Sequence, residues 1–156
     1  MRVLFVCLGN ICRSTMAEAV FREKVKKAGL ESKISVSSAA TSSWNLGDPP
    51  YKGTRDILDR YKISYDGIYS TKITSEEYET SDVIIGMDEN NLSDLLQMAP
   101  KGSNPNKIEL LISDSIGEKR REVPDPYYTG DFELTYGLID FATDKWLEKI
   151  KKEGNF

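Results

Sequence analysis

Apolar residues occur along this chain in two patterns that alternate with each other. Short continuous runs at residues 3–6 and 83–85 are typical of strands that are buried on both faces of a parallel sheet. Between these two runs, Ile34 and Val36 alternate with polar residues and indicate another strand. Ile108, Leu110 and Leu111 indicate a fourth strand after the second run. The pattern therefore predicts four strands.

Between these runs, apolar residues recur at helical spacing. The first such segment extends from Met16 to Ala28 and is followed by Gly29, a residue that commonly ends helices. Three further groups indicate later helices, of which we expect the last to face the core: Ile57, Leu58 and Tyr61; Leu92, Leu95 and Leu96; Leu134, Leu138, Phe141, Ala142 and Trp146. Strands that alternate with helices predict a single α/β domain over residues 1–156, with helices on both faces of a parallel sheet.

The composition narrows the class of protein. The chain has 156 residues, of which 39% are hydrophobic and 29% charged, as in a globular domain. A formal net charge of -4 argues against a general nucleic-acid binder. No apolar run approaches the ~20 residues of a membrane span, and no cleavable leader is recognisable, so we expect a cytoplasmic protein.

The chain contains two cysteines and no histidine. Two cysteines cannot form the disulfide framework of a secreted domain, and they point instead to reactivity or metal binding. The absence of histidine excludes zinc sites built on imidazole, Ser-His and Cys-His nucleophile pairs, and every histidine general base.

The loop after the first strand carries the densest candidate chemistry, Cys7-Leu8-Gly9-Asn10-Ile11-Cys12-Arg13-Ser14. In parallel sheets, ligands bind beyond the carboxyl ends of the strands. Five residues separate Cys7 from Arg13, enough for backbone N–H groups to surround one tetrahedral anion at a helix N-terminus. Gly9 permits a positive φ or a close approach, and the Arg13 fork can hold two phosphate oxygens.

The positive potential of this loop favours the thiolate form of Cys7, and a thiolate beside an anion site predicts attack on phosphorus. The alternative for Cys7 is an inert thiol at a strand end. The Gly-Lys-Ser/Thr ending of a nucleotide-binding loop is absent. Ser14 could cap the helix or donate a hydrogen bond to the thiolate, and Thr15 with Glu18 also fits a capping box.

Phosphate transfer from an alcohol also needs a proton for the leaving oxygen, which an aspartate or glutamate must supply here. Asp125 is the best candidate. It lies between Pro124 and Pro126, whose fixed φ angles stiffen the loop, and Tyr127 and Tyr128 follow directly. The alternative is an ordinary Pro-Asp-Pro turn at the surface.

The run over residues 3–14 and the segment Val123-Pro124-Asp125-Pro126-Tyr127 resemble the two motifs of the low-molecular-weight protein tyrosine phosphatase family. The resemblance spans nearly the whole chain. It implies the phosphotyrosine phosphatase I fold, a four-stranded parallel sheet with flavodoxin-like winding. It also implies Cys7 as the nucleophile that forms a cysteinyl-phosphate, Arg13 as the phosphate clamp and Asp125 as general acid and then base. No metal or organic cofactor is expected.

The resemblance assigns supporting roles as well. Asn10 braces the loop together with Ser14 and Ser38, although Ser38 could be a strand-end hydroxyl without consequence. Four residues wall the entrance to the site: Trp44, Asn45, Tyr127 and Tyr128. Core packing is the alternative for Trp44. Asp88 is expected to cap the helix after the third strand.

The sequence departs from the family pattern in two places. Thr15 stands where a proline usually presets the first helical turn. The histidine that commonly supports the phosphate loop from behind is also missing, because the chain contains none.

The expected substrate is a tyrosine-phosphorylated protein or peptide, with inorganic phosphate as a product inhibitor. A protein-arginine phosphatase is an alternative. Family members that resemble such enzymes have a threonine before the second loop cysteine, where this chain has Ile11. Arsenate reductases resemble this loop too but use cysteines further along, and none follows Cys12. A non-catalytic phosphate-binding module would lack Cys7 or Asp125.

A redox role is the second class of function that the loop suggests. Cys12 follows Cys7 by five positions, so that a disulfide between them could silence the enzyme reversibly. The alternative for Cys12 is a small, buried apolar residue.

Overall fold

Four parallel strands form the central sheet: β1 (Arg2–Cys7), β2 (Ser35–Ala40), β3 (Val83–Gly86) and β4 (Ile108–Leu110). In the computed structural model, which describes residues 1–156, their order is β2-β1-β3-β4. β1 therefore lies in the interior of the sheet and pairs with β2 on one side and with β3 on the other. The order is that of a flavodoxin-like winding, which confirms the predicted fold class.

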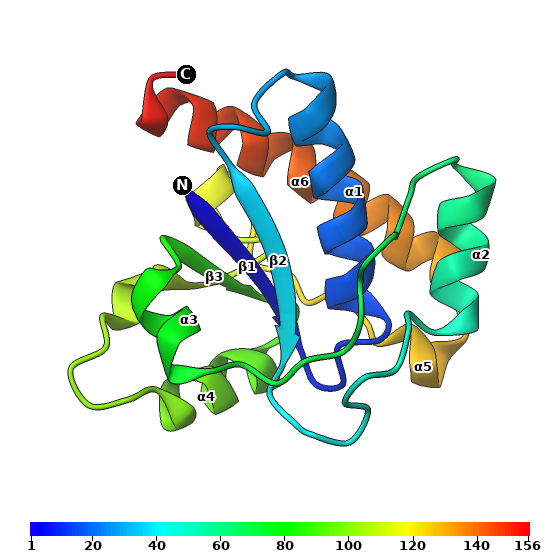
Figure 1. Cartoon of the computed structure of the whole chain (residues 1–156), viewed down its shortest axis with the longest axis horizontal. Coiled ribbons are helices and arrows are strands. Elements are labelled where there is room, and N and C mark those ends of the chain that lie inside the picture. Colours follow the sequence, from blue (N-terminus) through cyan, green and yellow to red (C-terminus); the bar gives the residue numbers. More distant parts are fainter.

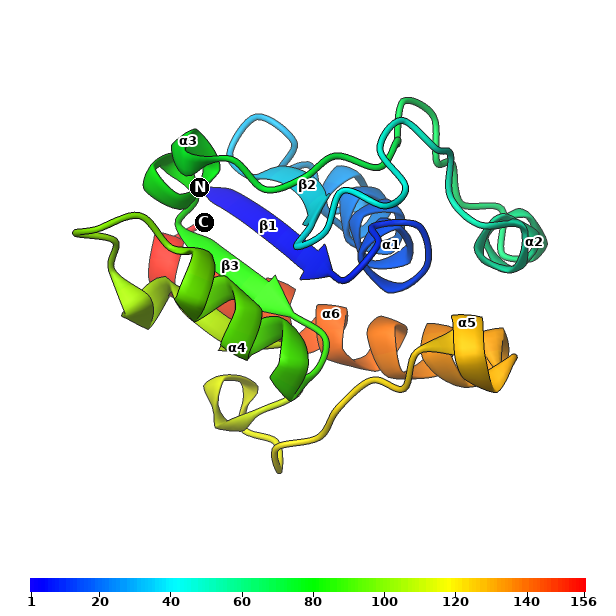
Figure 2. The same cartoon turned by 90° about the horizontal axis from the view of Figure 1, so that it is seen from below.

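Six helices accompany the strands: α1 (Arg13–Lys27), α2 (Lys52–Arg60), α3 (Ser75–Thr80), α4 (Glu89–Met98), α5 (Pro126–Thr129) and α6 (Phe132–Gly154). Figures 1 and 2 show α1 and α6 on one side of the sheet and α3 and α4 on the other. The four long helices confirm the apolar pattern, whereas α3 and α5 lie in segments where that pattern indicated no helix. None of the helices combines the length and apolarity that crossing a membrane requires.

The two faces of β1 contribute to two separate apolar clusters, because successive side chains of a strand point in opposite directions. Phe5 belongs to the larger cluster, which lies against α1 and α6 and includes Phe21. The rings of Phe5 and Phe21 meet edge to face, with centroids 5.6 Å apart. Leu4 belongs to the smaller cluster with Leu95 of α4. Burial on both faces explains why the sequence of β1 is continuously apolar.

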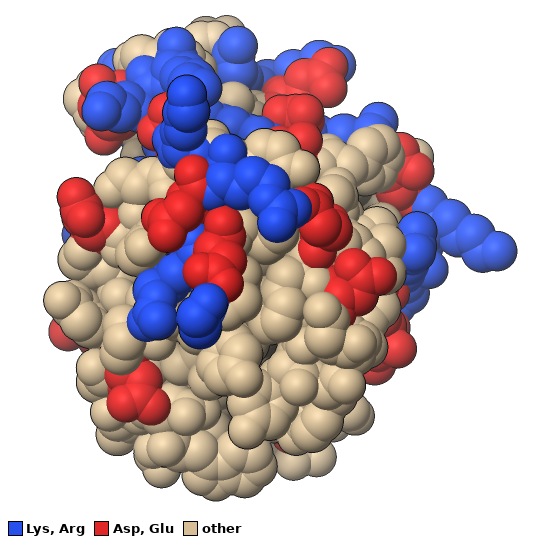
Figure 3. All heavy atoms as spheres, turned by 90° about the vertical axis from the view of Figure 1, so that its right-hand side faces the viewer, with Lys and Arg blue, Asp and Glu red and all other residues tan.

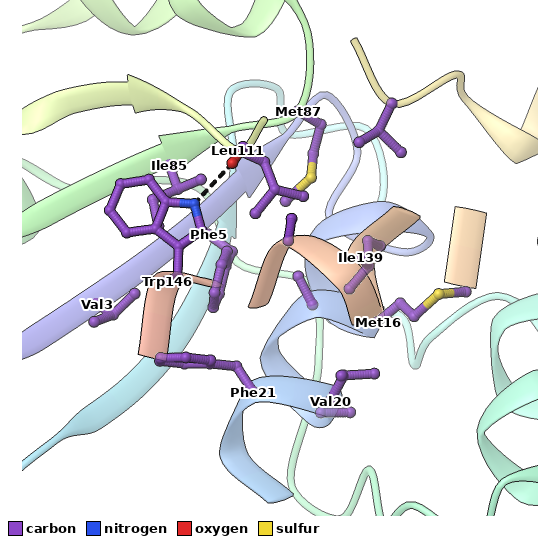
Figure 4. Close-up of a cluster of buried hydrophobic side chains, with 14 of the residues drawn as sticks. Val3, Phe5, Met16, Val20, Phe21, Ile85, Met87, Leu111, Ile139 and Trp146 are labelled. Carbon is purple, nitrogen blue, oxygen red and sulfur yellow. Dashed lines mark hydrogen bonds between the residues drawn. The ribbon is translucent and has the colours of Figure 1, made fainter. Parts of the chain in front are cut away.

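α6 buries a different stripe of residues from the one expected. Trp146 is buried as predicted, and its indole N–H donates to the carbonyl oxygen of Leu111 over 2.7 Å (Figure 4). Leu134 and Phe141, which were expected to face inward, are 41% and 43% exposed. Ile139 takes the inner position instead. A helix with apolar residues on more than one side can turn only one stripe toward the core, and packing against α1 selects that stripe.

Candidate active site

The loop over residues 8–12 joins the carboxyl end of β1 to the start of α1. Cys7 is the last residue of β1, and Arg13 is the first residue of α1. β2 and β3 lie on opposite sides of β1 in the sheet, so the strand order reverses at β1. The loop therefore lies at the topological switch point, where such folds bind their ligands. The position is the one that the sequence predicted for an anion site.

The loop owes its tight curvature to two adjacent residues. Asn10 is buried and adopts a left-handed conformation with a φ of 53°. A non-glycine residue in this region is held there by its surroundings. Gly9 serves a close approach instead of a positive φ, because a Cβ atom there would lie 2.7 Å from Nδ2 of Asn45. Gly9 thus provides the close approach that the sequence suggested, whereas the positive φ occurs at Asn10.

Hydrogen bonds hold Asn10 from three directions. Its Nδ2 donates to Oγ of Ser14 over 2.7 Å and to Oγ of Ser38 over 2.9 Å. Its Oδ1 accepts a hydrogen bond from the backbone N–H of Thr71 over 3.0 Å. The hydroxyl of Ser70 donates to the carbonyl oxygen of Gly9 over 2.9 Å. Sequence reasoning missed Thr71 and Ser70, because neither carries a local signal of a role in a loop 61 residues away.

The start of α1 differs from both registers that the capping signals suggested. The N-cap residue is Cys12, and no side chain caps it. Ser14 lies inside the helix, and its Oγ is 3.1 Å from Sγ of Cys7, so that reading Ser14 as a simple N-cap is wrong. Thr15 donates to the carbonyl oxygen of Cys12 over 3.1 Å, and Glu18 accepts a hydrogen bond from Ser38 over 2.6 Å. The capping box is therefore wrong as well.

Arg13 is buried and held by fixed acceptors. Its Nη1 donates to Oδ2 of Asp88 over 2.7 Å and to the carbonyl oxygen of Val123 over 2.9 Å. Its Nη2 lies 3.5 Å from Oδ2 of Asp125, while its Nε is buried without a partner. Burial disfavours the charge of Arg13, but the neighbouring Cys7 and Asp88 outweigh it, and the pKa of Arg13 is raised. A permanent cation is thus fixed behind the loop.

Asp88 has two functions in the structure, of which the sequence indicated one. Its Oδ1 accepts a hydrogen bond from the backbone N–H of Asn91 over 2.8 Å, which confirms the predicted cap of α4. Its other oxygen makes the ion pair with Arg13. The partners are 75 residues apart, and a helix cap has the same local sequence with or without such a pair. No sequence signal separated the two cases.

A cavity of about 270 Å³ opens above the loop. Ten residues line it: Cys7, Leu8, Gly9, Ile11, Cys12, Trp44, Asn45, Asp125, Tyr127 and Tyr128. Trp44 and Tyr128 are 74% and 76% exposed, so that core packing is the wrong interpretation for Trp44. The structure thus brings both sequence motifs and all four predicted wall residues to one cavity. Asn10, Ser14 and Ser38 are buried behind it.

The cysteines differ in their surroundings although both are free and buried. Burial first, and then the charges of Cys7 and Asp125, raise the pKa of Cys12 to about 12, so that Cys12 is a neutral thiol at physiological pH. Cys7 instead faces the hydroxyl of Ser14. No group of three or more His, Cys, Asp or Glu side chains is arranged to hold a metal ion.

Asp125 is held at the edge of the cavity by its own helix. It is the N-cap of α5, and its Oδ1 accepts a hydrogen bond from the backbone N–H of Tyr127 over 3.0 Å. Its side chain is 24% exposed, and its other oxygen faces Arg13. The carboxyl group is thereby accessible from the cavity and also fixed in direction.

A parallel α/β sheet whose first strand ends in a cysteine, followed by an anion-sized loop and a buried arginine, defines a cysteine-dependent phosphatase. Residues 2–155 match the low molecular weight phosphotyrosine protein phosphatase family, and the chain belongs to this family. The protein is a hydrolase of phosphotyrosine that works through a cysteinyl-phosphate intermediate.

Relatives and solved structures agree with this assignment. The chain is 44% identical to the low molecular weight protein-tyrosine-phosphatase YfkJ of Bacillus subtilis, over 97% of this chain and 96% of the relative. It is 41% identical to PtpA of Staphylococcus epidermidis over 98% and 96% of the two chains. The crystal structure of YfkJ covers 98% of this chain and 96% of its own with a TM-score of 0.92. That of DARP, a Drosophila arginine phosphatase, is 33% identical with a TM-score of 0.86, over 97% and 98%.

Proposed function

We propose that Cys7, Arg13 and Asp125 carry out the hydrolysis in this chain as nucleophile, phosphate clamp and general acid. The observation that supports this most directly is that Cys7 and Asp125 line the same cavity, although 118 positions separate them in the numbering. The unpartnered Nε of Arg13 and its Nη2 offer two N–H groups in one plane, which suits two oxygens of a phosphate.

The chemistry follows in two steps. The Cys7 thiolate attacks phosphorus, the bond to the tyrosine oxygen breaks, and protonated Asp125 gives its proton to that oxygen. Water then attacks the cysteinyl-phosphate while the Asp125 carboxylate takes its proton, and Cys7 leaves as a thiolate. The N–H groups of the loop and Arg13 stabilise the charge on the phosphate oxygens, and the Ser14 hydroxyl stabilises the thiolate.

Exchange of the nucleophile tests this assignment. Cys7→Ser should abolish hydrolysis of p-nitrophenyl phosphate and still bind vanadate, because the loop and Arg13 remain. Cys12→Ser is the matched control in the same loop and should retain most of the activity. If Cys12→Ser were as inactive as Cys7→Ser, the roles assigned to the two thiols would be wrong.

We expect phosphotyrosine to be preferred over other phosphorylated residues. The aromatic side chains of Trp44, Tyr127 and Tyr128 wall the cavity and suit a flat ring, and Ile11 adds an apolar side chain to its lining. The likeness to DARP keeps phosphoarginine as the competing substrate. Peptides with phosphotyrosine, phosphoserine or phosphoarginine in one sequence context should be compared by kcat/KM. A higher value for phosphoarginine would contradict the preference.

Reversible oxidation is proposed as a layer of control on this activity. Peroxide would oxidise the Cys7 thiolate to a sulfenic acid, and the Cys12 thiol would then displace water to form a disulfide. Peroxide should inactivate the wild type in a form that dithiothreitol restores, with inorganic phosphate protecting as a bound product. Cys12→Ser should lose activity irreversibly. Equal recovery of both proteins would remove Cys12 from the mechanism.

The remaining expectations concern partners and location. Inorganic phosphate, as the product, should bind the loop and compete with substrate. The absence of nucleic-acid binding and a location in the cytoplasm stay predictions from the sequence.

A further inference from the structure

Three aromatic rings form a continuous row that starts at the mouth of the cavity. Tyr127 lines the cavity, and its ring meets that of Tyr51 edge to face, with centroids 5.5 Å apart. The ring of Tyr51 is stacked on that of Phe132, with centroids 5.9 Å apart and planes 7° from parallel. We call Tyr127, Tyr51 and Phe132 the aromatic row. It extends the wall of the cavity onto the surface beyond it.

The row is both fixed and accessible. The backbone N–H of Tyr51 donates to the carbonyl oxygen of Ile11 over 2.7 Å, which ties the row to the phosphate loop. Gly53 makes room for Phe132, because a Cβ atom at Gly53 would lie 2.4 Å from that ring. Tyr51 and Tyr127 are nevertheless 41% and 55% exposed. Rigid aromatic side chains of this kind bind a partner at a low cost in conformational entropy.

Charged side chains flank the row, but two of them are paired with opposite charges: Lys52 with Asp56, and Glu133 with Arg60. Figure 3 shows the side of the molecule that carries α2 and α5, and its lower part has almost no Lys, Arg, Asp or Glu side chains. Exposed apolar surface that continues from a substrate pocket marks a place where a partner is bound. The row begins inside the pocket at Tyr127 and continues outside it through Tyr51 and Phe132, so a phosphotyrosine in the pocket would bring the neighbouring residues of its own chain to the outer part of the row.

We propose that the aromatic row binds an apolar side chain of the substrate protein, close in sequence to the phosphotyrosine. This proposal rests on the proposed function, in which the cavity takes the phosphotyrosine ring. An extended peptide rises by about 3.3 Å per residue, so that rings spaced as in the row correspond to positions about two to four residues from the phosphotyrosine. The row is thus a determinant of substrate choice, separate from the reacting groups.

Tyr51→Ala tests the proposal against a matched control on the same helix. Tyr61 follows the other end of α2, is 43% exposed and is stacked on Tyr136 with centroids 4.1 Å apart. It lies about 15 Å from Tyr51 along α2. Two sets of phosphotyrosine peptides, with leucine or serine at the flanking positions, should be compared by kcat/KM on the wild type, Tyr51→Ala and Tyr61→Ala.

The wild type and Tyr61→Ala should prefer the leucine peptides by about tenfold, the effect expected for partial burial of one leucine side chain. Tyr51→Ala should lose this preference and hydrolyse p-nitrophenyl phosphate at a rate within about twofold of the wild type.

A loss of activity on both the peptides and p-nitrophenyl phosphate would mean that Tyr51 only braces the loop, and an unchanged preference would mean that the row binds nothing. A wild-type dimer that dissociates in Tyr51→Ala would assign the row to self-association. Each of these results overturns the proposal, whereas a wild type without activity on p-nitrophenyl phosphate would contradict the proposed function.

A second, independent observation concerns the hydrogen bonds behind the loop. Asn10 uses both protons of Nδ2, one for Ser14 and one for Ser38. Each serine oxygen therefore accepts from Asn10 and directs its own proton onward. Ser38 donates to Oε1 of Glu18 over 2.6 Å, and Ser14 faces Sγ of Cys7 over 3.1 Å. The amide of Asn10 thus connects the carboxyl group of Glu18 at one end to the sulfur of Cys7 at the other.

Glu18 determines the direction of this chain of hydrogen bonds. An ionised carboxylate only accepts, so it draws the Ser38 proton away from Asn10 and leaves the serine oxygen free to accept. Burial raises the pKa of Glu18, while the bond from Ser38 and the charge of Arg22 oppose that rise. The Arg22 guanidinium donates to the carbonyl oxygens of Asp66 and Ser64 and makes no ion pair with Glu18.

We infer that Glu18 is a positioning residue for Cys7, acting through Ser38, Asn10 and Ser14. It supplies the supporting acceptor behind the phosphate loop in a chain that has no histidine to do so. The property that matters is the acceptor oxygen at this position. The size of the side chain alone would not orient Ser38.

Two variants of nearly equal length separate these possibilities. Glu18→Gln keeps an acceptor and should stay within about threefold of the wild-type kcat on p-nitrophenyl phosphate. Glu18→Met keeps the length without the acceptor and should lower kcat about tenfold with KM nearly unchanged, the effect of one hydrogen bond to a charged group. In a Ser38→Ala background, the change to methionine should have no further effect on kcat, because the connection is already lost.

Thermal unfolding of each variant accompanies these measurements. If kcat of the variants followed their melting temperatures, and if Glu18→Met were as active as Glu18→Gln at equal stability, Glu18 would have only a packing role. A full effect of Glu18→Met in the Ser38→Ala background would show that Glu18 does not act through Ser38. Either result overturns the inference.

Discussion

The floor and the rim of the cavity are built in opposite ways. We call floor the layer behind the phosphate loop, formed by Asn10, Ser14, Ser38 and Glu18, whose polar atoms are joined by hydrogen bonds of 2.6–2.9 Å. The rim consists of exposed side chains, of which Trp44 and Tyr128 make no hydrogen bond that fixes them, and both are about three-quarters exposed. The floor is therefore held by directional hydrogen bonds, whereas the rim consists mostly of exposed aromatic side chains.

This difference separates the reaction from the choice of substrate. A thiolate and a phosphate must be held within a fraction of an ångström, which a buried network achieves because each polar group that it leaves unpaired is costly. Side chains at the rim contact only the part of the substrate that does not react. Changes at the floor should therefore alter kcat on every substrate, and changes at the rim should alter kcat/KM while kcat stays nearly unchanged. Asp125 lies at the border, because it contacts Arg13 below and caps the helix that carries Tyr127 above.

Apart from loss of the nucleophile Cys7, the largest effect is expected from Asp125, which belongs to the rim in position and to the floor in chemistry. Asp125→Ala should slow hydrolysis of p-nitrophenyl phosphate by about 10²–10⁴-fold, the usual contribution of a general acid. Asp125→Asn should be equally slow but more stable by about 1 kcal/mol, because asparagine still caps α5. The loss should shrink as the leaving phenol becomes more acidic. A loss of the same size for all leaving groups would indicate a disturbed cavity instead of a missing proton.

Exchange of Asn10 tests whether the floor acts through its network or through its backbone. Asn10→Gly accepts the positive φ but removes all three hydrogen bonds, and kcat should fall by about 10- to 100-fold. Asn10→Ala should show the same kcat but lose about 1 kcal/mol more of the free energy of unfolding, because alanine is strained in the left-handed region. Urea unfolding and steady-state kinetics of the pair decide between the two. Near-wild-type activity of Asn10→Gly would show that only the backbone matters.

A smaller and more selective effect is expected at the rim. Trp44→Ala should lower kcat/KM on phosphotyrosine peptides about three- to tenfold, because one aromatic contact with the substrate ring is lost. Its kcat on p-nitrophenyl phosphate and its melting temperature should stay at the wild-type values, since the side chain is 74% exposed. A marked fall in stability would place Trp44 in the floor and contradict the separation of floor and rim.

The smallest expected effect is on stability, and it comes from Glu18. Burial raises the pKa of Glu18 in the folded protein above its value in the unfolded chain, so that the folded state binds this proton more tightly. The contribution of Glu18 to stability is therefore fully present below the unfolded pKa and is lost as the pH rises through the folded pKa. Glu18→Gln should remove this loss and unfold at a slightly higher urea concentration at neutral pH. A variant less stable than the wild type at neutral pH would contradict this direction.

The sequence predicted the sheet well because local and global signals agree there. The continuous apolar run of β1 is required by burial on both faces, and burial on both faces is what a central parallel strand experiences. In α6 the apolar pattern and the burial disagree, because Leu134 and Phe141 are apolar but exposed. α3 was missed although Thr74 and Glu77 form a complete capping box, because the apolar pattern is weak in so short a helix.

The candidate site was predicted as far as its groups lie in contiguous motifs. Cys7 and Arg13 are close in sequence, and the Pro-Asp-Pro segment marks Asp125. The contacts behind the loop join residues that no motif connects, such as Glu18 with Ser38 and Arg13 with Asp88. Glu18 looked like half of a capping box because a local pattern is the same whether or not a distant hydroxyl captures its carboxylate. Only the tertiary structure distinguishes these cases.

Because Cys12 is buried, its alkylation can be used to measure the folded fraction of a sample. Reagents such as iodoacetamide modify thiolates, and a thiol with a pKa of about 12 presents almost none at neutral pH. Alkylation of the folded chain should therefore stop at one label, on Cys7. When the chain unfolds, Cys12 regains an ordinary thiol, and the same reagent adds a second label. The ratio of singly to doubly labelled protein, read as a mass difference, reports how much of a sample is folded without any spectroscopic probe.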